Sequence, residues 1–188
     1  EATLLPTYGL VLVPDEAPVP GDYRVELLDA AGHVVISHPV PLHEAEEGGL
    51  VARSIYASVP LPATSISSLR LLQGDRIVAE RALRPVVPGL LDALRIEQAA
   101  GQVVLRWGAP EVPALVRYTV DDGRTWTTVG LDVLGGELRL DPRTLPDGAG
   151  RFEVTLADTV PPVVLTVELP HPRPEAGPSR LDISEAFP

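Results

Sequence analysis

The sequence lacks four residue types altogether: cysteine, methionine, lysine and asparagine. Without cysteine there is no thiol nucleophile, no disulfide, no iron–sulfur cluster and no cysteine-ligated zinc. Without lysine there is no Schiff-base chemistry and no phosphate-binding lysine of the Walker type. Without asparagine there is no N-glycosylation acceptor. A GC-rich genome would produce this bias, and so would selection at high temperature, which disfavours thermolabile residues.

Positive charge is also scarce, and the chain is acidic overall. Its 188 residues include 15 basic side chains, all arginine, against 26 acidic ones, which gives a formal net charge of −11. Such a field repels phosphate backbones, so we expect no nucleic-acid partner. No apolar run approaches the ~18 residues that a membrane-spanning helix needs, so we expect no membrane span.

Proline and glycine interrupt the sequence every few residues, with 21 and 16 copies respectively. They fall between short apolar runs that alternate with period two, the pattern of half-buried strands. The composition and the alternation predict an all-β chain. The expected strands are residues 8–13, 23–27, 34–37, 51–59, 69–72 and 76–82, then 93–97, 103–107, 115–120, 125–130, 137–141, 151–157 and 163–169.

The spacing of these runs predicts two tandem β-sandwich domains, the first immunoglobulin-like. We assign residues 1–85 to the first domain and 92–169 to the second, joined by a proline-containing linker at 86–91. Residues 170–188 form a proline-rich tail that cannot bury enough surface to fold by itself. The segment 43–48 is the one place where we expect a short helix.

The second half contains three patterns that fit one family. They are Val103, Leu105 and Trp107 on one strand, then Val116, Tyr118 and Val120 on the next, and finally Leu145-Pro146-Asp147-Gly148 before Phe152. Together they resemble a fibronectin type III domain over residues 92–169. The resemblance implies that the first three side chains point into a sandwich core. Phe152 stands where the family has the tyrosine of its corner, so the corner hydroxyl bond is absent.

A sharper local motif lies inside this region. Thr119, Asp121, Gly123, Thr125 and Trp126 follow the order Thr-x-Asp-x-Gly-x-Thr-Trp, which resembles the Asp box of sialidases and other secreted β proteins. The resemblance implies a structural role away from catalysis. Asp121 would accept backbone N–H groups, Gly123 would supply a positive φ, and Trp126 would bury its ring beneath the hairpin.

No constellation predicts a catalytic site or a bound cofactor. His43 begins a His-Glu-x-x-x segment like that of zinc proteases, but position i+4 is Glu47 where a second histidine is needed. Calcium is the one metal that we keep open, with Asp92 or the Asp121–Asp122 pair as oxygen donors. The candidate partner contacts are Tyr8, Tyr56, Arg117 and Arg139, with the two arginines expected on outer sheet faces.

These expectations combine into a non-catalytic structural or interaction module. We expect it to be the C-terminal accessory region of a larger secreted or surface-exposed bacterial protein, in contact with the rest of that polypeptide and with another protein or a glycan. A carbohydrate-binding module attached to a glycosidase or other hydrolase is the alternative. A third hypothesis, a small hydrolase, needs a cleft between the domains with two carboxylates ~5–9 Å apart.

Overall fold

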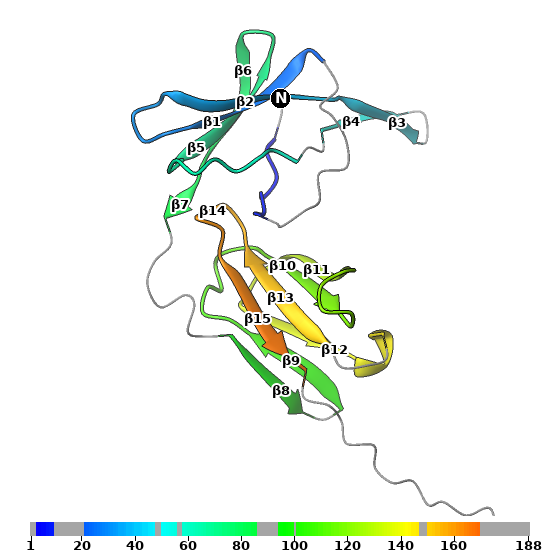
Figure 1. The fold of residues 1–188 in the computed structure, drawn as a ribbon. Coiled ribbons are helices and arrows are strands. Elements are labelled where there is room, and N and C mark those ends of the chain that lie inside the picture. Colours follow the sequence, from blue (N-terminus) through cyan, green and yellow to red (C-terminus); the bar gives the residue numbers. More distant parts are fainter. Residues whose placement is uncertain are drawn as a thin grey trace, which may run out of the picture.

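A computed structural model describes residues 3–9, 21–47, 50–55, 58–85, 94–99, 101–146 and 150–169. Regular structure in these residues consists of β-strands and one turn of 3₁₀ helix, η2 (Pro142–Thr144). No helix among the described residues is long and apolar enough to cross a membrane. The predicted all-β class is confirmed. Figure 1 shows the strands gathered into two parts: an N-terminal part, residues 3–85, and a C-terminal part, residues 94–169.

The N-terminal part is built on a four-stranded antiparallel sheet in the order β2-β1-β5-β6. Its strands are β1 (Tyr23–Leu28), β2 (Val34–Val40), β5 (Ser68–Gln73) and β6 (Arg76–Ala82). Both predicted hairpins are present, because the turns that contain Gly32 and Gly74 place these glycines at positive φ. Alternation then separates the faces: Val25 and Leu27 lie on one side of the sheet and Glu26 on the other.

The core of this part is small. It contains Leu27, Ile66 and Leu69, with partly buried neighbours that include Leu4 and Val160, the latter from the C-terminal part. On the opposite face Glu26 is only 6% exposed, because the side chains of Arg24 and Arg70 lie over it and pair with it. These hydrogen bonds hold the pKa of Glu26 below its usual range although burial opposes the shift.

A third hairpin, β3 (His43–Glu47) with β4 (Leu50–Ser54), corrects two predictions. The short helix expected at 43–48 is wrong, because this segment is an extended strand. Five residues are too few to repay helix nucleation, whereas antiparallel pairing gives their backbone partners at once. An ion pair between Glu44 and Arg53 across the strands, at 2.7 Å, adds to the pairing. The strand expected at 51–59 ends at Ser54, with residues 56–57 outside the described part.

The C-terminal part contains two sheets. The first has the order β12-β9-β8 and the second β11-β10-β13-β15. Each expected strand of this region is present, with its ends shifted by a few residues. The strands are β8 (Arg95–Ala99), β9 (Gln102–Arg106), β10 (Ala114–Thr119), β11 (Thr127–Val133), β12 (Glu137–Leu140), β13 (Arg151–Leu156) and β15 (Val164–Glu168).

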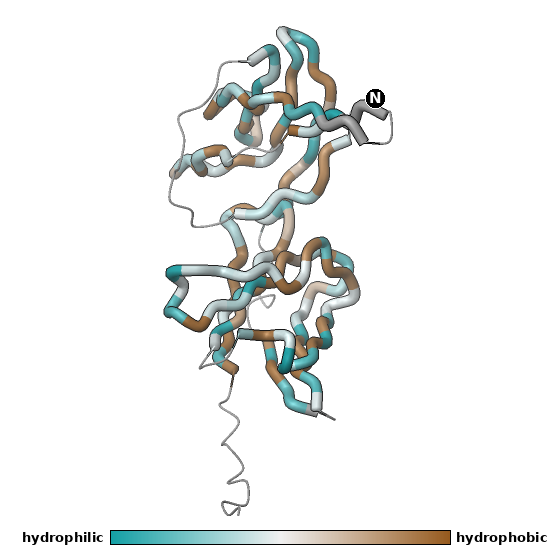
Figure 2. Tube along the Cα trace, turned by 90° about the vertical axis from the view of Figure 1, so that its right-hand side faces the viewer, coloured by the Kyte–Doolittle hydropathy of each residue, from teal (hydrophilic) through white to brown (hydrophobic). Residues whose placement is uncertain are grey.

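One hydrophobic core joins the two sheets. Val103, Leu105 and Trp107 contribute from the β9 side, and Tyr118 and Phe152 from the other sheet, all at most 5% exposed. The rings of Tyr118 and Phe152 lie 4.7 Å apart between centroids. Figure 2 shows hydrophobic and hydrophilic segments alternating along the chain in both parts, as the sequence pattern predicts. The inward orientation expected for the β9 residues is therefore observed.

The two parts meet through a short parallel pair, β7 (Arg84–Pro85) with β14 (Thr159–Val160). Residues 3–9 run between the parts and contact both of them (Figure 1). The predicted linker at 86–91 and the predicted tail at 170–188 lie outside the described residues.

Candidate functional site

The turn at residues 119–125 is held by a dense set of side-chain hydrogen bonds. The Thr119 hydroxyl donates to one Asp121 oxygen at 2.7 Å and accepts the Gly123 N–H at 3.0 Å. The other Asp121 oxygen accepts the Thr125 hydroxyl at 2.6 Å, and the Thr125 N–H donates back to the first oxygen at 2.8 Å. Asp122 and Gly123 both adopt positive φ, at 56° and 86°. The four predicted motif residues of the turn are thus brought together around one carboxylate.

The hydrogen bonds of this turn change the acidity of Asp121. Donation from the Thr125 hydroxyl, then from the Thr125 N–H and the Thr119 hydroxyl, lowers the pKa of Asp121 to about 2. Both carboxylate oxygens are engaged by the chain itself. The arrangement stabilises the turn, and it leaves Asp121 ionised over the whole physiological range.

Trp126 lies over arginines at the end of the same turn. Its ring is half-buried, and the guanidinium carbon of Arg117 lies 4.8 Å from the ring centroid. The guanidinium carbon of Arg151 lies 5.7 Å from the same centroid. These are cation–π contacts, which hold the indole flat against the sheet. The ring therefore covers charged side chains on the outer face of the four-stranded sheet, instead of entering the hydrophobic core.

Arg117 occupies the outer sheet face, as predicted, but little of it is accessible. It is 7% exposed and pairs with Glu153 directly across in the register of β10 and β13, with Nε 3.0 Å from Oε1. A partner could therefore reach Arg117 only after displacing the groups that cover it. Its geometry is that of a cross-strand ion pair beneath Trp126.

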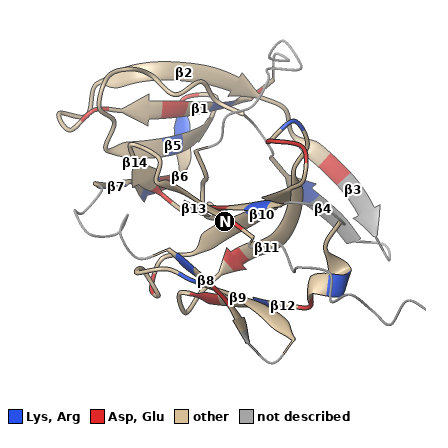
Figure 3. Cartoon of the chain, turned by 60° about the horizontal axis from the view of Figure 1, so that its bottom comes forward, with Lys and Arg blue, Asp and Glu red and all other residues tan. Residues whose placement is uncertain are grey.

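Arg139, the other predicted contact arginine, is exposed and belongs to a surface network. Glu137 accepts from Arg139 at 2.5 Å and from Arg106 at 2.8 Å, and Arg106 also pairs with Glu97 at 2.6 Å. The charged residues of β8, β9 and β12 can be followed in Figure 3. Their long side chains cover Val104, which is 1% exposed on the same face.

The predicted tyrosine contacts have different outcomes. Tyr8 donates its hydroxyl to Asp132 on β11 at 2.6 Å, which links residues 3–9 to the C-terminal part. Burial and the Asp132 carboxylate raise the pKa of Tyr8, so the hydroxyl keeps its proton and stays a donor. Tyr56 lies outside the described residues.

The junction between the two parts centres on Asp158, a residue that the sequence analysis did not single out. Its carboxylate, 9% exposed, accepts the Thr7 N–H at 3.0 Å and the Thr7 hydroxyl at 2.9 Å on one oxygen. Arg81 of β6 donates to the other oxygen at 2.6 Å and also to the Leu4 carbonyl. The backbone of Asp158 exchanges further bonds with Thr7 and Arg84. One carboxylate therefore ties three chain segments together.

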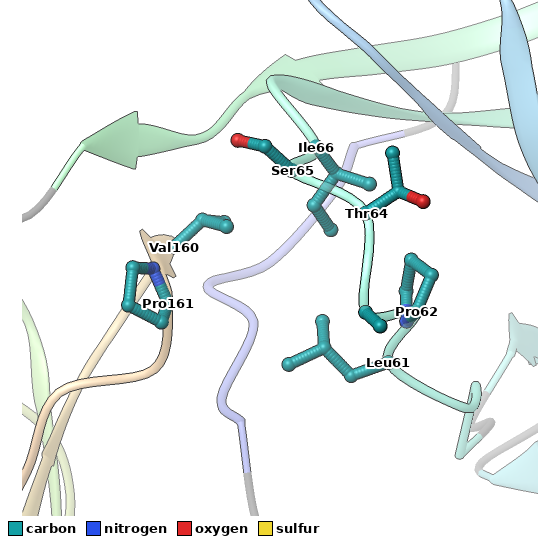
Figure 4. A pocket seen from close by; sticks show the side chains of 8 residues that line it. Leu61, Pro62, Thr64, Ser65, Ile66, Val160 and Pro161 are labelled. Atoms are coloured by element: carbon teal, nitrogen blue, oxygen red, sulfur yellow. The ribbon is translucent and has the colours of Figure 1, made fainter.

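Beside this junction lies a hollow of about 280 Å³. Figure 4 shows its walls, a loop of the N-terminal part facing the turn of β14. The lining consists of apolar and hydroxyl side chains without an ionisable group: Leu61, Pro62, Ala63, Thr64, Ser65, Ile66, Val160 and Pro161. The Thr64 and Ser65 hydroxyls of this lining have no ionisable side chain beside them in the hollow that could act as their general base.

Among the described residues, no group of three or more histidine, aspartate and glutamate side chains lies close enough to hold a metal ion. His33 is paired with Asp29 at 3.3 Å in the first hairpin turn. Of the calcium candidates, Asp121 is engaged in its own turn and Asp92 lies outside the described residues.

No protein-family model fits the chain, and no curated protein resembles it at a significant level. The geometry of the junction and of the Trp126 surface is therefore the basis for any functional conclusion.

Proposed function

We propose that this chain is a non-catalytic structural and interaction module, in which two β units are held at a fixed orientation and present their outer faces to partners. The module would belong to a larger secreted or surface-exposed bacterial protein. The observation that carries the proposal is the Asp158 junction, whose contacts lie between segments far apart in the sequence.

The contacts at the junction are those of a rigid connection between the two parts. Arg81 and Thr7 both bind the Asp158 carboxylate, and residues 3–9 add contacts at Leu4 and Tyr8 on either side of it. Charge-assisted hydrogen bonds with little solvent access are the stronger kind. A rigid junction of this type suits a module that holds its neighbouring domains at a constant distance and orientation.

The strand order of the C-terminal part supports a fibronectin type III-like assignment. Seven strands form its two sheets, leaving aside β14, which pairs with β7. Counted in chain order, the first, second and fifth (β8, β9 and β12) form one sheet, and the third, fourth, sixth and seventh (β10, β11, β13 and β15) form the other. That division matches the family's arrangement, to which residues 103–107 already pointed. For the N-terminal part, the described strands support an all-β unit with one main sheet and a hairpin.

Spin-label distance measurements test the proposal directly. Because the chain has no cysteine, Gln73→Cys with Gln102→Cys places one exposed label on each part. We expect a single narrow distance distribution, and a broader one when Arg81→Met is added. A distribution that is broad in the parent pair would contradict a fixed orientation, and no change on adding Arg81→Met would contradict the role of Asp158.

A carbohydrate-binding module is the second candidate, favoured by the half-exposed ring of Trp126. Stacking of a sugar on an aromatic ring needs such an accessible face. Binding of a glycan array by the full chain, lost in Trp126→Ala and retained in Tyr8→Phe, would support it. Absence of binding to every glycan leaves the interaction module as the better description.

A further inference from the structure

Arg151 differs from the other arginines that are not fully exposed. The described arginines that are buried or half-buried are Arg24, Arg70, Arg81, Arg117 and Arg151. All except Arg151 form an ion pair with a carboxylate of the chain. Glu168 lies directly across from Arg151 in the register of β13 and β15, yet no ion pair joins them. A half-buried guanidinium without a carboxylate partner is unusual, because its charge loses part of its solvation and gains only the cation–π contact with Trp126 in return.

The surroundings of Arg151 aim its guanidinium at the surface beside Trp126. Its Nε is buried without a hydrogen-bond acceptor, whereas its terminal nitrogens are not among the buried atoms of this kind. Gly123 faces both side chains of the site: a Cβ at this position would come within 3.0 Å of Arg151 Nη2 and 3.2 Å of Trp126 Cζ2. Glycine at this position therefore leaves the space that the guanidinium occupies. The terminal N–H groups are left as donors next to an aromatic surface.

The aromatic half of the site is held in place before any ligand binds. Trp126 follows directly on the turn that Thr119, Asp121 and Thr125 fix by hydrogen bonds. The neighbouring Arg117–Glu153 pair is already satisfied and nearly buried, so it does not compete for a ligand. An aromatic surface fixed in this way loses little conformational freedom on binding.

From these observations we infer that Arg151 and Trp126 form a recognition site for a single carboxylate on a partner protein, the side chain of an acidic residue whose methylene groups rest on the indole. This inference rests on the proposed role as an interaction module. A guanidinium can grip a carboxylate with two parallel hydrogen bonds. The net charge of −11 and the nearby Asp121, Asp122 and Glu153 oppose a polyanion such as a uronate polymer, and this favours a lone carboxylate.

The test uses the two tryptophan indole N–H signals in an NMR titration of the full chain. Trp126 reports on the site, and Trp107, 5% exposed in the core, serves as the internal reference. The probe is glutamate capped as N-acetyl and C-methylamide, added to about 20 mM because one charge-assisted contact corresponds to millimolar affinity. We expect the Trp126 signal to shift saturably while the Trp107 signal stays in place. Capped glutamine, which has the same shape without the charge, should produce no saturable shift.

Two variants separate the site from a general charge effect. Arg151→Gln should weaken the affinity at least about tenfold. Arg124→Gln removes an exposed arginine of the same turn and should leave the affinity unchanged. The Trp107 signal shows in each variant whether the core is intact.

Several outcomes would overturn the inference. They are no Trp126 shift with capped glutamate, an equal shift in Arg151→Gln, and an equal shift with capped glutamine. Saturable binding of glucuronate in the absence of glutamate binding would assign the site to acidic sugars, and the peptide inference would fall. The spin-label distances do not depend on Arg151, so failure here is distinguishable from failure of the fixed-orientation proposal.

Discussion

Asp158→Asn is the sharpest perturbation of the junction, because it removes a charge and keeps the shape. Asp158 adopts a φ of 55°, a conformation that asparagine also tolerates, so the backbone should not change. The amide oxygen can still accept from Thr7, but the amide nitrogen then faces Arg81, so both the charge and the acceptor that Arg81 meets at 2.6 Å are lost. Arg81 then remains 27% exposed without a counter-charge.

The expected cost follows from these distances and exposures. Two unit charges about 4 Å apart attract by ~4 kcal/mol at an effective dielectric constant of about 20. Solvation of Arg81, which is 27% exposed, returns roughly 1 kcal/mol of this attraction when the pair is broken. We therefore expect Asp158→Asn to lower the free energy of unfolding by about 2–3 kcal/mol.

Urea unfolding can measure this cost, with circular dichroism for the whole chain and tryptophan fluorescence for the C-terminal part, where both tryptophans lie. The dichroism transition should move to lower urea than the fluorescence transition, because the N-terminal part loses its rigid connection. Glu44→Gln is the matched control, since it breaks the exposed pair with Arg53 and should cost less than about 0.5 kcal/mol. A cost for Asp158→Asn no larger than that of the control would refute the reasoning.

Three further predictions concern the C-terminal part. The carboxyl signal of Asp121 should titrate near pH 2 in NMR. Because the pKa of Asp121 is lower in the folded than in the unfolded chain, its contribution to stability is full above about pH 4 and disappears as the pH falls through 2. Gly150→Ala would place a Cβ 1.8 Å from the Tyr118 hydroxyl oxygen and should cost about 3 kcal/mol in urea unfolding, against about 1 kcal/mol for Gly101→Ala, which has open space at a φ of 76°; equal costs would contradict this packing. Phe152→Ala, at a fully buried position, should cost about 4 kcal/mol by thermal unfolding, and a loss under about 1 kcal/mol would show that the core is not as described.

Strands of the C-terminal part could be predicted because each has its own local signal. Leu138 and Leu140, for example, alternate with Glu137 and Arg139, and proline or glycine marks the ends of most runs. The same reasoning failed at residues 43–47, where the sequence His-Glu-Ala-Glu-Glu has good helix formers and no apolar alternation. There the pairing with β4 decided the conformation, and pairing partners are not encoded within the strand itself.

The turn at 119–125 was predictable for the same local reason, since its residues lie within a few positions of one another. The junction was not, because Thr7 and Arg81 are 151 and 77 positions from Asp158. No spacing rule connects residues so distant, and only the packing of the two parts brings them together. Arg151 was missed because the lack of an ion-pair partner cannot be read from the sequence. It becomes visible only when the side chains around Arg151 are placed in space.

The hydrogen bonds from Thr7 to Asp158 also determine where mechanical load enters the molecule. Tension applied to the chain before Leu4 reaches the bonds of Leu4 to Arg81, of Thr7 to Asp158 and of Tyr8 to Asp132 before it reaches β1, so the first bonds to resist are those of the junction and of Tyr8. Those bonds share the load among several segments instead of peeling one strand from its sheet. Strand β1 is therefore shielded from a pull at that end until these hydrogen bonds break.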